Sequence, residues 1–194
     1  KTAFAPSDGS TIYAVLIADG SVSGFDRGSL QGIYVSRDKG LTWRVVAPGG
    51  SALFNPFLYD INYGKYSCSI VVNPANPDLV YLGGINVWEG RKISETGFYQ
   101  WQQKTVGEIG VFIHTILPDP SNSHRFYCAT NNGVGATEDN FSTFKRLNRN
   151  YNSSMFNTVA FDDKGNAMGG LSNGALLYMN KQGNTPETGE FIGI

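Results

Sequence analysis

The residues best suited to chemistry in this chain are four carboxylates that stand outside its repeated segments. Two carboxylates on either side of a sugar could hydrolyse a glycosidic bond, with the groups roughly 6.5–9.5 Å apart for an inverting reaction. No spacing in the sequence pairs any two of the four, and each is consistent with a solvated loop residue. Asp60 and Glu108 are the best candidates for catalytic acids, and the other two are Glu89 and Glu95.

Metal and cofactor chemistry have little support in the sequence. The two histidines, His114 and His124, and the two cysteines, Cys68 and Cys128, show none of the short spacings typical of metal ligands. One disulfide could join the cysteines, and the sequence leaves open whether it does. No glycine-rich run precedes a helix in the way that a phosphate-binding loop requires. We therefore expect no metal and no cofactor.

Aromatic side chains gather in or near the predicted connections. Tyr59, Tyr63 and Trp88 stand close to asparagines, and His114 stands in the apolar run 111–117. Aromatic rings beside amides suit the binding of carbohydrate or protein. In the other interpretation the rings cap a glycine-rich core and His114 is a hydrogen-bonded core residue. Both interpretations stay open, and these four residues are our candidates for ligand contact.

The composition indicates which elements must position these residues. The 194 residues include 24 glycines, 13% are aromatic and 16% are charged. Glycine supplies the positive φ angles of tight turns, and aromatic residues favour strands, so we predict an all-β chain. The formal net charge of −1 argues against nucleic-acid binding. No apolar run is long enough to cross a membrane.

Internal repeats sharpen this prediction. A proline is followed seven residues later by a tyrosine in three segments, at Pro6, Pro74 and Pro120, and a weaker fourth copy covers 159–168. We predict that each copy forms four short antiparallel strands, which is how a β-propeller blade looks in sequence. The expected fold is an all-β propeller segment of about four blades within a larger propeller. The approximate blades are 1–62, 63–108, 109–152 and 153–194.

A second pattern follows each repeat. A hydroxyl residue is followed by Asp two positions later, Gly four later, and Thr with an aromatic residue six and seven later. The copies are Ser36, Asp38, Gly40, Thr42 and Trp43, then Thr137, Asp139, Thr143 and Phe144, and in reduced form Ser94 and Trp101. This pattern resembles the Asp box, or BNR repeat, of propellers in sialidases, sortilin-like receptors and xyloglucanase-like glycoside hydrolases. Because it recurs from blade to blade, we interpret Asp38 as a residue that fixes a turn.

The resemblance carries expectations about function. The run 63–88 is most similar to large surface and secreted propellers of Bacteroidota, many of them associated with type IX secretion. This implies a non-catalytic binding or scaffold propeller outside the cytoplasm, secreted, periplasmic or on the cell surface, that recognises protein or glycan and could be linked to an outer-membrane secretion complex. A protein partner, or the remainder of a longer chain, is expected to complete the propeller.

Two alternatives follow from the same resemblance, a xyloglucanase-like glycoside hydrolase and a sortilin-like ligand receptor. Sialidase chemistry is disfavoured because the chain lacks an Arg-Ile-Pro run. Relatives often carry an acidic residue at the position of Ser67 and a polar run over 110–114, where this chain retains only His114. For this reason we favour a protein that is not an enzyme.

Overall fold

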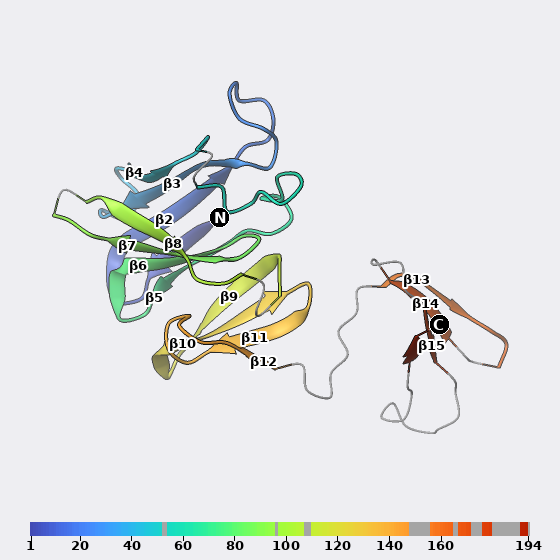
Figure 1. Ribbon diagram of the computed structural model, residues 1–194. Coiled ribbons are helices and arrows are strands. Elements are labelled where there is room, and N and C mark those ends of the chain that lie inside the picture. Colours follow the sequence, from blue (N-terminus) through green and yellow to red (C-terminus); the bar gives the residue numbers. More distant parts are fainter. Residues whose placement is uncertain are drawn as a thin grey trace. The chain divides into compact units, whose positions relative to one another are not determined.

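The computed structural model describes residues 1–51, 54–95, 97–106, 110–147, 156–164, 167–171, 176–179 and 191–193. In these residues all regular structure is β, arranged in four antiparallel sheets of four strands (Figure 1). The strand order in each sheet follows the order in the chain. The prediction of an all-β chain built from four-stranded antiparallel units is therefore confirmed. None of the described residues forms a helix of the length and hydropathy that a membrane span needs.

The chain divides into two compact units, Lys1–Asn150 and Tyr151–Ile194, and each is described by itself. The first unit holds three sheets. They are β1 (Thr2–Ala5), β2 (Asp8–Ile17), β3 (Leu30–Ser36) and β4 (Arg44–Pro48); β5 (Ser69–Asn73), β6 (Asn76–Gly83), β7 (Val87–Lys92) and β8 (Tyr99–Gln103); and β9 (Ile113–Asp119), β10 (Asn122–Thr130), β11 (Gly133–Thr137) and β12 (Lys145–Arg146).

The second unit holds one sheet, in which Phe156 of one edge strand pairs with Leu171 of the next. Its strands are β13 (Phe156–Phe161), β14 (Ala167–Leu171), β15 (Leu176–Met179) and β16 (Phe191–Gly193). The blade boundaries at 62, 108 and 152 stay predictions.

Short polar turns explain where the first two strands of each sheet begin and end. In the three sheets of the first unit an Asp or Asn side chain accepts a hydrogen bond from the backbone two residues later, which is the geometry of an Asx turn. The Asp8 carboxylate accepts from Ser10 N at 3.0 Å, Asn73 Oδ1 from Ala75 N at 2.9 Å, and Asp119 from Ser121 N at 2.8 Å. The turns at Asn73 and Asp119 reverse the chain between the two apolar strands of their repeats, whereas the turn at Asp8 follows the reversal at 6–7 and lies within β2.

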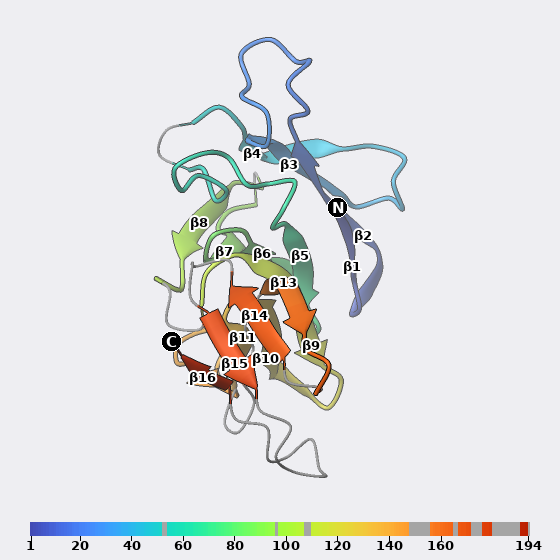
Figure 2. The same cartoon turned by 90° about the vertical axis from the view of Figure 1, so that its right-hand side faces the viewer.

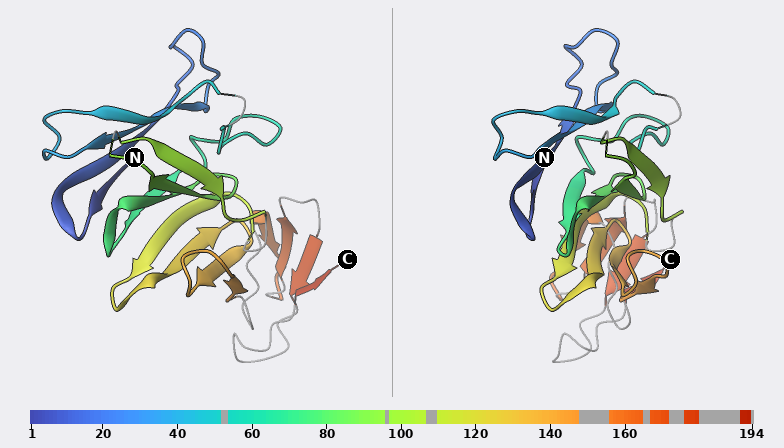
Figure 3. Two further views of the ribbon diagram at one scale, coloured as in Figure 1. Left: turned by 60° about the vertical axis from the view of Figure 1, so that its left-hand side comes forward. Right: turned by 90° about the vertical axis from the view of Figure 1, so that its left-hand side faces the viewer.

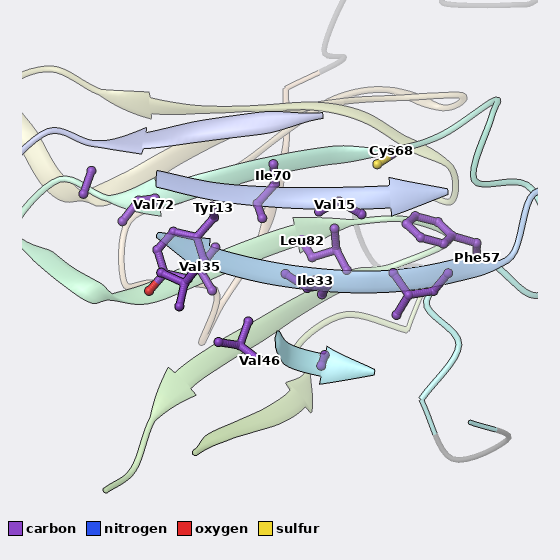
Figure 4. Close-up of a cluster of buried hydrophobic side chains, with 14 residues drawn as sticks. Tyr13, Val15, Ile33, Val35, Val46, Phe57, Cys68, Ile70, Val72 and Leu82 are labelled. Carbon is purple, nitrogen blue, oxygen red and sulfur yellow. The ribbon is translucent and has the colours of Figure 1, made fainter. Parts of the chain in front are cut away.

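Two hydrophobic cores hold the three sheets of the first unit face to face. Tyr13, Val15, Ile33 and Val35 of the first sheet pack against Ile70, Val72, Val80 and Leu82 of the second, and Phe57 closes the end of this cluster (Figure 4). The second core lies between the second and third sheets and contains Leu79, Tyr81, Ile113, Ile116, Phe126 and Phe141. Strand β6 serves both cores because its neighbouring side chains alternate between its two faces.

Antiparallel strands place the connections of the first unit alternately at two ends of its sheets. We call one the turn end, which holds the connections 6–7, 37–43, 74–75, 93–98, 120–121 and 138–144. The other is the loop end, with the connections 18–29, 49–68, 84–86, 104–112 and 131–132. In the left panel of Figure 3 the turns after β1, β5 and β9 lie together, and loop 18–29 projects from the opposite end of its strand, as it also does in Figure 2.

Candidate functional site

Five rings from two segments of the chain meet at the loop end, and we call them the aromatic cluster. Its members are Tyr59, Tyr63, Tyr66, Phe112 and His114. The Phe112 ring lies at the centre, with its centroid 4.8 Å from Tyr63, 5.5 Å from Tyr66 and 6.1 Å from Tyr59. All three contacts are edge-to-face, the geometry that aromatic pairs prefer. The cluster therefore joins the loop before β5 to the residue that precedes β9.

The backbone at Phe112 takes an unusual conformation. Its φ angle is 58°, in the left-handed region that bulky residues seldom occupy. Two hydrogen bonds to the 84–86 hairpin hold it, from Phe112 N to Ile85 O at 3.1 Å and from Ile113 N to Gly84 O at 2.7 Å. Backbone strain that the surrounding structure imposes is common at functional sites. The φ angle of Phe112 therefore supports the interpretation of the aromatic cluster as a candidate functional site.

His114 stands in a hydrogen-bonded network at the edge of the cluster. Its Nε2 lies 2.6 Å from Asn131 Oδ1, which also accepts a hydrogen bond from the Tyr66 hydroxyl at 3.0 Å. The imidazole meets the Tyr66 ring edge to face, with centroids 5.0 Å apart. His114 is half-buried, so its principal contacts are within the protein.

A cleft of about 310 Å³ lies beside the cluster and shares Tyr59 with it. Trp88, at the start of β7, forms another part of its wall and meets the Phe54 ring at 5.1 Å. Among the described residues that line the cleft, none carries a charge. Its lining consists of Asn55, Pro56, Leu58, Tyr59, Ile85, Asn86, Trp88, Gln103, Val106 and Val111.

Several backbone contacts fix the loop that carries one wall of the cleft. The Pro56 carbonyl accepts a hydrogen bond from Ile85 N at 2.8 Å, and Tyr63 N donates to Phe57 O at 2.8 Å. Phe57 is fully buried and anchors the loop in the core. A Cβ at Gly84 would overlap the Pro56 carbonyl oxygen, so this close approach requires glycine. The cleft is thus mounted on rigid elements.

The proposed carboxylates do not come together at this site. Asp60 is exposed, and the hydrogen bond from the Tyr63 hydroxyl lowers its pKa, whereas a general acid needs a raised pKa. Glu89 is buried and pairs with Arg91 at 3.2 Å. Glu95 lies at the turn end. Glu108 lies outside the described residues.

The residues of the second sequence pattern lie at the turn end, away from the cleft, except Trp101, which lies in β8 with its ring centroid 5.1 Å from that of Phe54. Asp38 Oδ1 accepts hydrogen bonds from the Ser36 hydroxyl at 2.7 Å and from Thr42 N at 2.8 Å, and Oδ2 accepts from the Thr42 hydroxyl at 2.6 Å. These bonds, those from Thr42 first, lower the pKa of Asp38 to about 2. Gly40 has a φ of 92°, and its carbonyl accepts from Trp43 Nε1 at 3.0 Å.

The second and third copies show how far this geometry is shared. Asp139 accepts from the Thr137 hydroxyl at 2.9 Å and from Thr143 N at 2.8 Å, and its pKa is also lowered to about 2. Phe144 takes the place of the indole and lies 6.1 Å from the Phe141 ring. In the third copy Ser94 Oγ accepts from Phe98 N at 3.3 Å, while Trp101 Nε1 donates to the Val46 carbonyl at 3.2 Å.

Neither a metal site nor a disulfide is found in the described part of the chain. No group of three or more His, Cys, Asp or Glu side chains is placed there to hold a metal ion. Cys68 and Cys128 are both free and buried, and they belong to different cores. Burial raises the pKa of Cys68 to about 11 and that of Cys128 to about 12.

Four residues that the sequence suggested for ligand contact, Tyr59, Tyr63, Trp88 and His114, are brought to one end of the sheets, and their role stays a prediction. Phe112, Tyr66 and Asn131 were missed. No sequence pattern points to these three residues. Phe112 has a backbone angle that its residue type does not predict. Asn131 matters only through its place in the β10–β11 turn.

Comparison with known proteins identifies the fold. No family model and no curated protein matches the chain, whereas solved structures do. A GH74 enzyme from Niastella koreensis is 18% identical with a TM-score of 0.57, and the match covers 100% of this chain and 29% of that one. The GH74 xyloglucanase from Xanthomonas campestris is 15% identical with a TM-score of 0.53, covering 100% and 30%. Both are β-propellers. The chain is part of a β-propeller.

This propeller segment spans less than a third of either GH74 structure. A third match is PorZ of Porphyromonas gingivalis, a bacterial surface component of the type-IX secretion system. It is 12% identical with a TM-score of 0.46, over 99% of this chain and 26% of that one. At these identities the matches show the fold and leave activity open. The three four-stranded sheets of the first unit have the form of blades of this fold.

Proposed function

We propose that this propeller segment is a non-catalytic binding module whose ligand site is the loop-end cleft with the aromatic cluster. One observation carries the proposal. Exposed aromatic and aliphatic side chains from separate connections converge on a cleft whose described lining bears no charge. Concave, mostly apolar sites with a few polar groups are typical of ligand binding. Hydrolysis would need a pair of carboxylates at this place.

A protein segment is the ligand that the lining favours. Leu58 is 52% exposed, Tyr59 68% and Val106 78%, which is far more than a closed core leaves in water. Exposed apolar patches of this kind, with aromatic anchors at the centre, mark protein interaction sites. The amides of Asn55, Asn86 and Gln103 at the rim could orient a peptide backbone. We therefore expect the cleft to take an uncharged, apolar side chain of a partner.

A selection of displayed peptides with and without the cleft tests this function. The cleft variant is Tyr59→Ser with Val106→Ser, and the control is Leu41→Ser with Phe98→Ser at the turn end, where both residues are also more than two thirds exposed. We expect the same apolar peptides to be enriched on the natural protein and on the control. The cleft variant should bind them at least about tenfold more weakly. Equal binding by both variants would show that the cleft is not the site.

A neutral glycan is the second candidate ligand, because Trp88 and Tyr59 stand beside three side-chain amides. Calorimetric titration with neutral β-glucan oligosaccharides separates the two ligands. Saturable binding that the cleft variant loses and the control keeps would favour glycan. If neither variant changes the heat of titration, the glycan does not bind in the cleft. Peptide then remains the favoured ligand class.

The alternative function is a xyloglucanase-like glycoside hydrolase with Asp60 and Glu108 as its acids. Its specific support is the resemblance described above, and the lowered pKa of Asp60 stands against an acid role. The release of reducing sugar from a β-glucan panel should be the same for the variant Asp60→Asn with Glu108→Gln as for the natural protein. A loss of hydrolysis in this variant would support the enzyme.

We further propose that the module works outside the cytoplasm and that another blade covers the free face of its first sheet. Phe4, Leu16 and Val45 lie on the face opposite Tyr13, and they are 66%, 45% and 47% exposed. The blade could come from the rest of a longer chain or from a partner. Light scattering should show self-association that Phe4→Ser with Leu16→Ser reduces. A protein that stays monomeric at all concentrations would contradict the proposal that this face needs a covering blade. Cell fractionation tests the location outside the cytoplasm.

A further inference from the structure

A second pocket lies at the turn end, between the first and second sheets of the first unit. Its volume is about 290 Å³. It shares no residue with the loop-end cleft and lies at the other end of the same strands. The pocket is lined by Val35, Arg37, Thr42, Trp43, Arg44, Lys92, Glu95 and Gly97.

The walls of this pocket are held by hydrogen bonds between the two sheets. Arg44 Nη2, at the start of β4, donates to the Gly97 carbonyl at 3.0 Å, and a Cβ at Gly97 would overlap the guanidinium. Trp43 is fixed by the bond from its indole N–H to the Gly40 carbonyl, and the residue stays 44% exposed. Arg37 forms an ion pair with Asp78 and donates to the Tyr99 hydroxyl at 2.8 Å. The pocket is thus preformed.

The charges that line this pocket do not balance. Three of the residues that line the pocket, Arg37, Arg44 and Lys92, are cationic, and one, Glu95, is anionic. Two carboxylates lie just outside the lining: Asp78 pairs with Arg37, and Asp38 accepts hydrogen bonds from Thr42. The chain as a whole has a net charge of −1. A ligand group with a single negative charge would meet this excess of cations in the lining, and partial burial strengthens such an interaction compared with one in open water.

The ammonium group of Lys92 is the donor best placed to meet such a group. Its nearest acidic partner is Asp78 Oδ2 at 3.8 Å, which is beyond hydrogen-bond distance. Among the described residues no side-chain hydrogen bond to this ammonium is found, although its side chain is only 27% exposed. A lysine ammonium carries three donors. The Trp43 indole beside it offers a flat face for a ring or an aliphatic chain.

We propose that this pocket binds a monoanionic oxygen group, a carboxylate or a sulfate ester, carried on a ligand that stacks on Trp43. The group lies against Lys92 and Arg44, and the attached ring lies on the indole. This site is separate from the loop-end cleft and does not depend on the proposed function.

Small aromatic anions test this site on the whole chain. Benzoate and phenyl sulfate are the probes, benzamide is the neutral control, and the Trp43 indole N–H is followed by NMR. We expect a saturable shift with either anion at concentrations up to about 20 mM, and no saturable shift with benzamide. The probe that binds more tightly identifies the preferred oxygen group. No shift with either anion, or an equal shift with benzamide, overturns the proposal.

Matched variants distinguish a specific anion site from a general electrostatic attraction to the positively charged residues. Lys92→Met should weaken binding of the anion at least about tenfold. Lys39→Met removes the same charge from an exposed residue of the 37–43 turn that does not line the pocket, and should leave binding within about twofold. Equal losses in the two variants would show a non-specific field and overturn the site. Exposed Glu95→Gln should tighten binding, a result that does not depend on how Lys92→Met folds.

Discussion

The two ends of the first unit differ in what they repeat. At the turn end, Asp38 and Asp139 make the same set of hydrogen bonds in two sheets, although their neighbours differ. At the loop end, the connections differ in length and sequence, and they form the aromatic cluster, a separate contact of Phe54 with Trp88 and Trp101, and two pockets with different linings. A geometry that recurs in successive blades serves the blade, whereas one that occurs once can serve a ligand. The contrast separates residues that stabilise the fold from residues that recognise.

The largest effect that tests this contrast is expected from Phe126→Ala. Phe126 is fully buried, and its ring lies 4.9 Å from Tyr81 and 5.3 Å from Phe141 of the 138–144 turn. Removing the ring leaves a cavity, so the free energy of unfolding should fall by about 3–5 kcal/mol. Tyr59→Ala at the loop end should change it by no more than about 0.5 kcal/mol. Chemical denaturation measures both, and similar losses would erase the contrast.

Gly84→Ala should have the next largest effect, because Gly84 packs against the loop that forms one wall of the cleft. The new methyl group would overlap the Pro56 carbonyl and force the 54–58 segment away from the hairpin. Such overpacking costs about 1–3 kcal/mol of unfolding free energy. Gly9→Ala is the matched control, since a Cβ there meets no atom within 4 Å. If the two variants unfold alike, the close approach at Gly84 does not hold the loop.

Much of the turn end could be predicted from the sequence. The hydrogen bonds of the second sequence pattern join residues only four positions apart, such as Asp38 and Thr42, so the local sequence spacing predicts them. The strands follow for the same reason, because β-rich composition and Asx turns are local signals. Fold prediction succeeded to that extent.

The loop end was predicted only as a set of residues, because its geometry comes from contacts distant in the chain. The rings of Tyr63 and Phe112 meet at 4.8 Å, although the two residues are 112 − 63 = 49 positions apart in the chain. Nothing local at Phe112 predicts a positive φ, and nothing near Asn131 predicts its contact with His114. The second pocket was not foreseen either, since Lys92 and Trp43 belong to different sheets.

Acid should weaken the turn end in a defined pH range. The pKa of Asp38 and that of Asp139 fall from the usual 3.8 to about 2 in the folded state, through the hydrogen bonds they accept from Thr42 and Thr143. A lowered pKa means that the stabilisation is present above about pH 4 and is lost as pH falls towards 2. Melting temperatures should therefore drop over this range, by less than Phe126→Ala causes because the turns are exposed.

The double variant Asp38→Asn with Asp139→Asn tests this range. It should melt below the natural protein near neutral pH, and the gap should narrow as pH falls towards 2, where the two carboxylates of the natural protein are about half protonated. Asp26→Asn is the control, since no described residue donates a side-chain or backbone hydrogen bond to the Asp26 carboxylate. A gap that stays constant with pH would show that the turns do not depend on ionised Asp.

The smallest effect concerns two residues that share a backbone angle at opposite ends. Lys39 has a φ of 60° and Phe112 a φ of 58°. Glycine takes this conformation without the Cβ penalty, so Lys39→Gly should raise the free energy of unfolding by up to about 1 kcal/mol. Phe112→Gly relieves the same strain but removes the ring that Tyr59, Tyr63 and Tyr66 contact, so it should give no gain. Chemical denaturation of both variants measures this difference. If Phe112→Gly raises the free energy of unfolding as much as Lys39→Gly does, the ring contacts of the aromatic cluster do not stabilise the backbone at Phe112. The positive φ angle there would then have no link to the site.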